Sequence, residues 1–213
     1  MGGGGYFNMK TNSLDIRNMD CMELMREYPD NHFDLAVVDP PYGIDVTKME
    51  MGGRKRNKED KAKSWDTGAP SQEYFNELFR VSTNQIIWGG NYFELPCSQY
   101  FAIWDKGETM YGRDFAECEQ AWVRKGGTRI CKSGPNQLDR SHPTQKPVKL
   151  YNWIFANYAE PGMTILDTHM GSGSIAIAAH YAGMHLTACE LDEDYYKAAC
   201  ERIDNETRQS TFL

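Results

Sequence analysis

The sequence predicts an α/β fold, a doubly wound and mostly parallel sheet with an antiparallel edge. Short apolar runs alternate with helical stretches along the whole chain. Residues 35–38 are apolar throughout, as strands buried on both faces of a parallel sheet are, and residues 163–166 form a second short apolar strand. Each of these two strands ends in a carboxylate, Asp39 and Asp167. The 213 residues are enough for one domain with a full core.

The first part of the chain is predicted to form a strand, a helix and a second strand. Residues 13–17 alternate in polarity, as a short strand does, and the helical stretch after Asp20 ends at Pro29. Residues 33–38 form the second strand, which gives a right-handed crossover if the two strands are parallel. Residues 44–66 lack periodicity and are rich in Gly, Lys and Arg, which predicts a mobile basic loop able to close over a substrate.

The middle of the chain adds helices and strands. A helix opens with Ser71 as its N-cap and runs through Phe79. Strands are predicted over residues 84–88, 99–104 and 115–124, the last of them near an antiparallel edge. Residues 126–141 are predicted to be a connection, and residues 146–158 a helix.

The last part repeats the alternation of strand and helix. After the strand at residues 163–166, a glycine turn over residues 170–174 opens a helix of small residues that ends at Gly183. A strand over residues 185–189 ends in Glu190, and a helix over residues 192–203 closes the fold. We therefore expect a single domain over residues 13–205, a flexible N-terminus over residues 1–12 and a tail over residues 206–213.

The composition argues against several classes of protein. No apolar run approaches the roughly 20 residues of a membrane span, and the glycine-rich start lacks the apolar core of a signal peptide. The six cysteines form no Cys-x-x-Cys pair and no Cys/His cluster with zinc spacing. We expect a cytoplasmic protein with reduced thiols, no metal site and no membrane partner, and a homodimer stays open.

The charge is unevenly distributed. The net charge of −7 argues mildly against a nucleic-acid partner. However, residues 52–64 hold six basic and two acidic residues, and residues 121–150 hold seven basic residues and one acidic residue. A localised basic surface can bind the phosphates of double-stranded DNA although the net charge is negative. The alternative is that these runs are solvated loops.

The stretch Asp39-Pro40-Pro41-Tyr42-Gly43 is the first candidate site. Two successive prolines cannot continue a strand ladder, so the backbone leaves the sheet in a stiff, extended turn. The Asp39 carboxylate and the Pro40 carbonyl are then acceptors beside the Tyr42 ring. This arrangement suits a planar group that donates two N–H bonds, such as the exocyclic amine of a nucleobase. The alternative is that the acid and the prolines only end the strand.

The stretch from Asp167 to Glu190 is the second candidate site. A strand, a glycine turn opening a helix, and an acid 23 residues after Asp167 are typical of a nucleoside-binding unit. The pattern is not Gly-x-Gly-x-x-Gly and has no Walker lysine, which favours a ligand without phosphate groups. If the two candidate strands are neighbours, ligand and amine meet at one edge of the sheet. The natural chemistry is then methyl transfer from S-adenosylmethionine to an amine.

Three motifs resemble those of the amino-methylating DNA methyltransferases of the class I, S-adenosylmethionine-dependent, Rossmann-like fold. They are Asp-Pro-Pro-Tyr at residues 39–42, His-Pro-Thr-Gln-Lys-Pro at residues 142–147, and residues 167–174, which are similar to the family's Asp-Pro-Phe-x-Gly-Ser-Gly-Thr. Their order, with the catalytic motif first, is similar to that of the circularly permuted beta group. Residues 88–92 and 104–106 also resemble that group, and the likeness spans roughly residues 14–203.

The resemblance implies a role for each candidate residue. The catalytic residues are Asp39, Pro40, Pro41 and Tyr42, with Tyr42 stacking on a flipped base. The cofactor-binding residues are Asp20 at the adenine, Glu190 at the ribose, Lys146 at the carboxylate, and Asp167, His169, Gly171, Ser172 and Gly173. The residues contacting the DNA backbone are Arg54, Lys55, Arg56, Lys58, Lys61 and Lys63. Residues 126–141 stand where larger relatives have a target-recognition region. Trp88, Trp104 and Tyr92 are expected to pack in the core or at the end of the sheet.

The resemblance also has departures and alternatives. Thr168 and His169 stand where the family has Pro-Phe, and Ser174 where it has Thr, which changes the groups beside the cofactor. The implied function is site-specific methylation of adenine N6 in DNA, in a restriction-modification or phage setting. The alternatives are N4-cytosine methylation, methylation of RNA or of a protein glutamine, and a non-catalytic DNA-binding remnant. An NAD-linked oxidoreductase is disfavoured by the missing third glycine.

Overall fold

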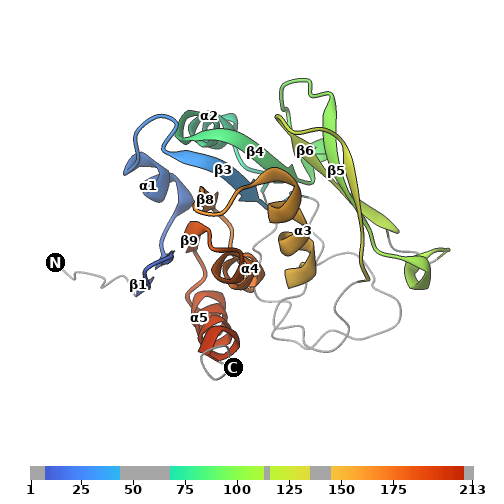
Figure 1. Ribbon diagram of the computed structural model, residues 1–213. Coiled ribbons are helices and arrows are strands. Elements are labelled where there is room, and N and C mark those ends of the chain that lie inside the picture. The colour runs from blue at the N-terminus through green and yellow to red at the C-terminus, as the bar shows by residue number, and fades with distance from the viewer. Residues whose placement is uncertain (1–7, 44–67, 113–115, 135–144, 209–213) are drawn as a thin grey trace.

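The computed structural model describes residues 8–43, 68–112, 116–134 and 145–208 (Figure 1). The strands of these residues form one sheet with the order β1-β2-β9-β8-β3-β4-β6-β5-β7. Their bounds are β1 Asn8–Lys10, β2 Leu14–Asn18, β3 Phe33–Val38, β4 Ser82–Trp88, β5 Tyr100–Asp105, β6 Cys118–Val123, β7 Arg129–Lys132, β8 Thr164–Asp167 and β9 His185–Glu190.

The predicted sheet is confirmed. Strands β2, β9, β8, β3 and β4 are parallel neighbours. Strand β6 runs antiparallel to both β4 and β5 and makes the predicted antiparallel part. Because β6 reverses direction, its first residues lie at the edge where β3 and β4 end.

Helices cover both faces of the sheet, as Figure 1 shows. Their bounds are α1 Cys21–Arg26, α2 Gln72–Val81, α3 Val148–Tyr158, α4 Ser174–Ala182 and α5 Glu193–Arg208, and two 3-10 turns span η1 Gly90–Tyr92 and η2 Glu108–Met110. Leu35 and Val37 of β3 pack in the core under α3, α4 and α5, whereas Ala36 and Val38 pack in the core under α1 and α2. Strand β3 is therefore buried on both faces, as its apolar sequence predicted. Among the described residues, no helix is both long and apolar enough to cross a membrane.

Four elements differ from the sequence prediction. Residues 1–12 were expected to be flexible, but Asn8–Lys10 form β1 because they pair with β2. Strand β7 lies in the expected connection at residues 126–141 and pairs with β5. Of its four residues only Cys131 is buried, so its apolar signal is weak. Helix α3 begins after Pro147 instead of at residue 146, and α5 continues to Arg208, where i,i+4 ion pairs support its last turns.

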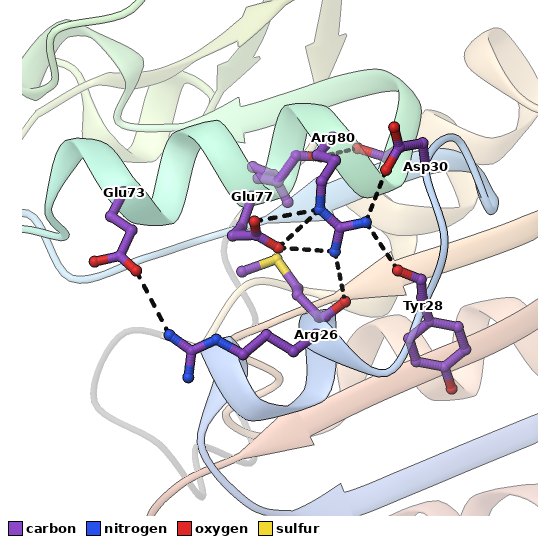
Figure 2. Close-up of polar contacts among 9 residues, drawn as sticks. Arg26, Tyr28, Asp30, Glu73, Glu77 and Arg80 are labelled. Carbon is purple, nitrogen blue, oxygen red and sulfur yellow. Dashed lines mark hydrogen bonds and ion pairs between the residues drawn. The ribbon is translucent and has the colours of Figure 1, made fainter.

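A polar network joins α1 to α2 (Figure 2). The Arg80 guanidinium of α2 donates to the carboxylates of Glu77 and Asp30 and to the backbone carbonyls of Tyr28 and Met25. A second pair, Arg26 with Glu73, is longer and largely exposed. Helix α2 thus donates to one carbonyl of α1 and to one just after its end.

Candidate active site

The two candidate stretches meet at one edge of the sheet. Asp39 follows β3, and Asp167 is the last residue of β8, the parallel neighbour of β3. Trp88 ends β4, the neighbour on the other side, and Gly89 and Gly90 follow it. The expectation that the two strands are adjacent is confirmed, so this edge is the candidate site that the sheet order predicts.

Asp39 and Tyr42 are fixed to each other. The Tyr42 phenol donates to Asp39 Oδ1 at 2.8 Å. Burial, and then the nearby charge of Asp39, raises the pKa of Tyr42, so the phenol keeps its proton. The Tyr42 ring stacks on Tyr92 with centroids 4.9 Å apart and planes 14° from parallel. Trp88 and Trp104 are buried, and Tyr92, for which we expected packing in the core or at the end of the sheet, lies in η1 just after β4 and is 48% exposed.

Gly89 makes room for the Tyr42 ring. Its φ of +65° lies in the left-handed region, and a Cβ there would overlap Cε1 of Tyr42. A glycine is therefore required at this position for two independent reasons, backbone conformation and contact with the ring.

Lys146 was expected at the carboxylate of the cofactor, and the structure instead places it between two carboxylates of the protein. Its ammonium donates to Asp39 Oδ2 and lies 3.3 Å from Glu119 Oε2, and its side chain is only 4% exposed. Glu119, from β6, also pairs with Lys106 at 2.9 Å. Burial opposes the charge of Lys146, but Asp39 and Glu119 outweigh it and raise the pKa of the lysine. Burial would raise the pKa of Glu119, and the two lysines outweigh this effect and hold it below its usual value.

The glycine turn is tied to the end of β9. Glu190 accepts hydrogen bonds from the backbone N–H of Gly171 at 2.9 Å and of Asp192 at 3.0 Å. Gly171 has a φ of +54° and open space where a Cβ would stand, so its backbone faces room for a ligand. Arg202 of α5 donates to the Ser172 carbonyl at 3.0 Å, which fixes the turn from behind.

Asp167 is buried below this turn and accepts from the backbone N–H of His169 at 3.0 Å. Burial raises the pKa of Asp167 to about 8, because the nearby hydrogen bond only partly offsets the loss of water. The carboxyl group is therefore largely protonated at neutral pH in the protein alone. A cation placed beside it would favour its ionised form.

The two residues that replace Pro-Phe of the family pattern, Thr168 and His169, form a polar cluster with Tyr74. Thr168 Oγ1 lies 2.6 Å from the Tyr74 hydroxyl and 2.9 Å from His169 Nδ1. The His169 ring meets Tyr74 edge to face at 5.5 Å. Burial lowers the pKa of His169 to about 4, so the imidazole is neutral at pH 7. These side chains link the end of β8 to α2, where the family pattern has a proline and an aromatic ring.

Asp20 serves as the N-cap of α1. Its Oδ1 accepts from the backbone N–H groups of Met22 at 2.8 Å and Glu23 at 3.3 Å. Sequence reasoning placed Asp20 at the cofactor's adenine, and the local structure gives it a capping role as well. Asp20 stands between β2, which pairs with β9, and α1.

Several predicted residues lie outside the described part of the chain. They are Arg54, Lys55, Arg56, Lys58, Lys61 and Lys63. Conversely, sequence reasoning missed Glu119 and the turn-fixing Arg202. Lys106 stood in a segment that resembles the family, but Glu119 belongs to no motif, and only its place on an antiparallel strand brings it to Lys146.

Comparison with known proteins gives three kinds of similarity. A family model described as DNA methylase, for N6 and N4 methyltransferases, matches residues 87–201. YubD of Escherichia coli (strain K12), named as a candidate methylase, is 25% identical over 209 residues, covering 86% of this chain and 87% of that protein. The type II methyltransferase M.HpaI of Haemophilus parainfluenzae is 30% identical over 71 residues, which cover 33% of this chain and 23% of that one.

Two solved structures have a similar fold. The M1.HpyAVI–SAM complex has a TM-score of 0.59 at 17% identity, covering 90% of this chain and 99% of that one. The PvuII DNA methyltransferase, described as cytosine-N4-specific, also has a TM-score of 0.59, at 12% identity, covering 94% and 93% of the two chains. At these identities the likeness concerns the fold, and it agrees with the α/β sheet described above.

Proposed function

Because this chain belongs to the N6/N4 DNA methylase family, we propose that it transfers a methyl group from S-adenosylmethionine to the N6 amine of adenine in double-stranded DNA. The family itself comprises S-adenosylmethionine-dependent enzymes that methylate an exocyclic amine of a DNA base. The observation that carries the proposal is the adjacency of β3 and β8, since it brings Asp39 and the glycine turn to one edge.

The residues at this edge fit S-adenosylmethionine. The glycine turn has room at Gly171, and two acids, Asp167 and Glu190, stand beside it. Both acids suit a ligand that carries a cationic sulfonium and an amino group, because a cation beside a buried carboxyl group favours its ionised form. When bound, S-adenosylmethionine supplies an electrophilic methyl group. In this proposal Glu190 binds the ribose, Asp20 lies at the adenine, and Asp167, His169, Gly171, Ser172 and Gly173 line the methionine end.

The target amine is held by the rigid turn after β3. The Asp39 carboxylate and the Pro40 carbonyl accept its two hydrogens, and Pro41 keeps the backbone extended. The amine lone pair is then aimed at the methyl group, so most of the acceleration comes from positioning and from acceptor bonds that strengthen as the nitrogen becomes cationic. Tyr42, fixed against Gly89, and the exposed Tyr92 offer aromatic surface to the base.

The base must leave the duplex before it reaches Asp39, since its amine is not accessible inside the stack. We propose that the basic residues of positions 54–63 hold the DNA backbone. That contact is electrostatic and independent of sequence.

Adenine is preferred over cytosine because the first motif residue is Asp39. Related cytosine enzymes more often carry serine there, so N4-cytosine methylation is the second candidate. Relatives that methylate RNA or protein glutamine more often have asparagine at that position. A non-catalytic remnant is disfavoured because Asp39, Tyr42 and Glu190 are all present and bonded.

One experiment tests the function and its finer form together. The protein is incubated with plasmid DNA and methyl-labelled S-adenosylmethionine, the DNA is digested to nucleosides, and the labelled nucleoside is identified. We expect the label in N6-methyl-2′-deoxyadenosine. If the label is found in N4-methyldeoxycytidine, the target is cytosine and not adenine. The absence of any label in DNA would refute the proposal.

The Asp39→Ala variant is the matched test of the catalytic residue. Methyl incorporation should be lost, because the amine loses its charged acceptor, whereas S-adenosylmethionine binding measured by calorimetry should change little. Normal turnover by this variant would show that Asp39 is not catalytic.

A further inference from the structure

Each oxygen of the Asp39 carboxylate already accepts a hydrogen bond before any substrate arrives. Its Oδ1 accepts from the Tyr42 phenol and its Oδ2 from the Lys146 ammonium. The ammonium neutralises the carboxylate that the target amine needs as an acceptor. During methyl transfer the amine nitrogen becomes cationic, and a second cation at the same carboxylate would oppose that charge. A shift of the Lys146 ammonium away from Asp39 would remove this opposition and leave Oδ2 to the target amine.

Glu119 offers Lys146 an alternative partner. Its Oε2 already lies 3.3 Å from Lys146 Nζ, so only a small movement of the ammonium is needed to exchange one carboxylate for the other. The Lys146 ammonium also lies 5.2 Å from the centroid of the Trp88 ring, which can stabilise a cation in a dry site. A buried ammonium cannot leave for water at low cost, so its movement depends on a second anion within reach.

Lys106 completes the charge balance. It pairs with Glu119 Oε1, which leaves Oε2 directed at Lys146. The four side chains thus hold two acids and two bases, and the transfer of Lys146 between the acids changes no net charge. The cluster draws on β3, β5, β6 and the segment before α3, elements that the tertiary fold alone brings together.

We propose that Glu119 is a positioning residue that takes the Lys146 ammonium from Asp39 as the target amine binds, so that Asp39 becomes free to accept the amine. This inference rests on the proposed methyltransferase function. In the transfer, the amine lone pair forms the N–C bond while the methyl C–S bond breaks and its electrons stay on sulfur. The methylated nitrogen then loses one proton to solvent by way of Asp39, and Lys146 stays protonated throughout.

The variant Glu119→Gln tests the inference. It keeps the shape of the side chain and removes the charge, so Lys146 remains on Asp39. With plasmid DNA and labelled S-adenosylmethionine at saturation, kcat should fall by at least about tenfold, while the calorimetric Kd for S-adenosylmethionine stays within about threefold. Glu119→Asp, which restores the charge, should recover part of the loss. Glu117→Gln, the same chemical change at an exposed carboxylate two residues earlier, is the control.

A double-mutant cycle with Lys146→Gln separates this role from a structural one. If Glu119 acts through Lys146, Glu119→Gln should change kcat by less than about twofold in the Lys146→Gln background. An equal loss in both backgrounds, wild-type kcat in Glu119→Gln, or loss of S-adenosylmethionine binding together with kcat would each overturn the inference. Failure of the wild-type protein to methylate DNA would instead refute the proposed function, on which the inference rests.

Discussion

Three neighbours hold Tyr42 in place. Its hydroxyl reaches Asp39, its ring stacks on Tyr92, and Gly89 lies against its edge. This arrangement suits a residue that stacks on a flipped base. Because the ring is already fixed, binding of the base does not cost conformational entropy at Tyr42. The Gly89 position is where this arrangement is most sensitive to change.

Replacement of Gly89 by alanine should displace the Tyr42 ring and reduce methyl transfer at least about tenfold, since small shifts of positioning groups are costly in catalysis. The control is Gly112→Ala. Gly112 has a similar φ of +70° but open space where its Cβ would stand, so it carries the backbone strain without the overlap. Gly112→Ala should lose about 1–2 kcal/mol of stability through the backbone strain, and Gly89→Ala should lose more because it adds the overlap. Equal activity in the two variants would contradict the role assigned to the ring contact.

Asp167 makes the stability of the protein depend on pH. Its pKa is raised to about 8 by burial, whereas in the unfolded chain it is ordinary, near 3.9. Between these values the folded protein keeps a proton that the unfolded chain releases. The contribution of Asp167 to the free energy of unfolding should therefore be greatest below about pH 4, fall as pH rises, and level off above about pH 8.

Urea denaturation of the wild type and of Asp167→Asn at several pH values measures this contribution. The stability of the wild type minus that of the variant should decrease by up to about 1.4 kcal/mol per pH unit between about pH 4 and 8. A difference that does not change with pH would mean that Asp167 is not buried as a protonated acid.

At the scale of elements, short helices depend on their neighbours. Helix α1 spans only Cys21–Arg26, with Asp20 capping its start and Arg80 of α2 binding the carbonyls near its end (Figure 2). An isolated helix of this length is not stable in water, so the contacts with α2 decide that it forms. Helix α5 plays a comparable part for the glycine turn, since Arg202 donates to it and Ile203 lies where a Cβ on Gly173 would stand.

Removal of the Arg80 side chain should destabilise the protein. Arg80→Ala removes the donor to the Glu77 and Asp30 carboxylates and to the Tyr28 and Met25 carbonyls. We expect a loss of about 1–3 kcal/mol in urea denaturation. Arg26→Ala is the matched control, because the Arg26–Glu73 pair is exposed, at 61% and 71%, and should be worth less than about 1 kcal/mol. A similar loss in both variants would show that the Arg80 network is not what joins the two helices.

At the scale of the whole molecule, the sheet order brings separate parts of the chain to one edge. Asp39 precedes Asp167 by more than half the chain, yet β3 and β8 are neighbours. The charge is also separated along the chain: residues 52–64 and 121–150 are basic, and residues 151–213, with nine acids and three bases, are acidic. A protein of net charge −7 can therefore still present positive charge to DNA.

DNA affinity should depend steeply on salt. We expect the logarithm of the DNA association constant to fall linearly with the logarithm of salt concentration, with a slope of about −0.9 for each phosphate contact. Replacement of Lys55, Lys58 and Lys61 by glutamine should reduce that slope and leave S-adenosylmethionine binding unchanged, as fluorescence anisotropy and calorimetry would measure. An unchanged slope would remove these lysines from the DNA interface.

The amino-acid sequence alone determined the local features of this protein. The apolar runs became parallel strands, the prolines after Asp39 ended β3, and Gly171, Gly173 and Gly183 adopt positive φ values in and after the predicted turn. Proline, glycine and apolar periodicity act over a few residues, so their effect can be read without the fold. The same signals placed Asp39 and Asp167 at strand ends.

Only the tertiary structure decided what surrounds those acids. Lys146 is 107 residues from Asp39 in the chain, yet the two side chains are in contact. Glu119 meets Lys146 because β6 runs antiparallel beside β4. Strand β7 exists because β5 offers it a partner, not because its own sequence is apolar. Contacts of this kind depend on strand order and direction, which many sequences with the same local pattern could satisfy differently. The charge balance at Asp39 is therefore a property of the folded molecule.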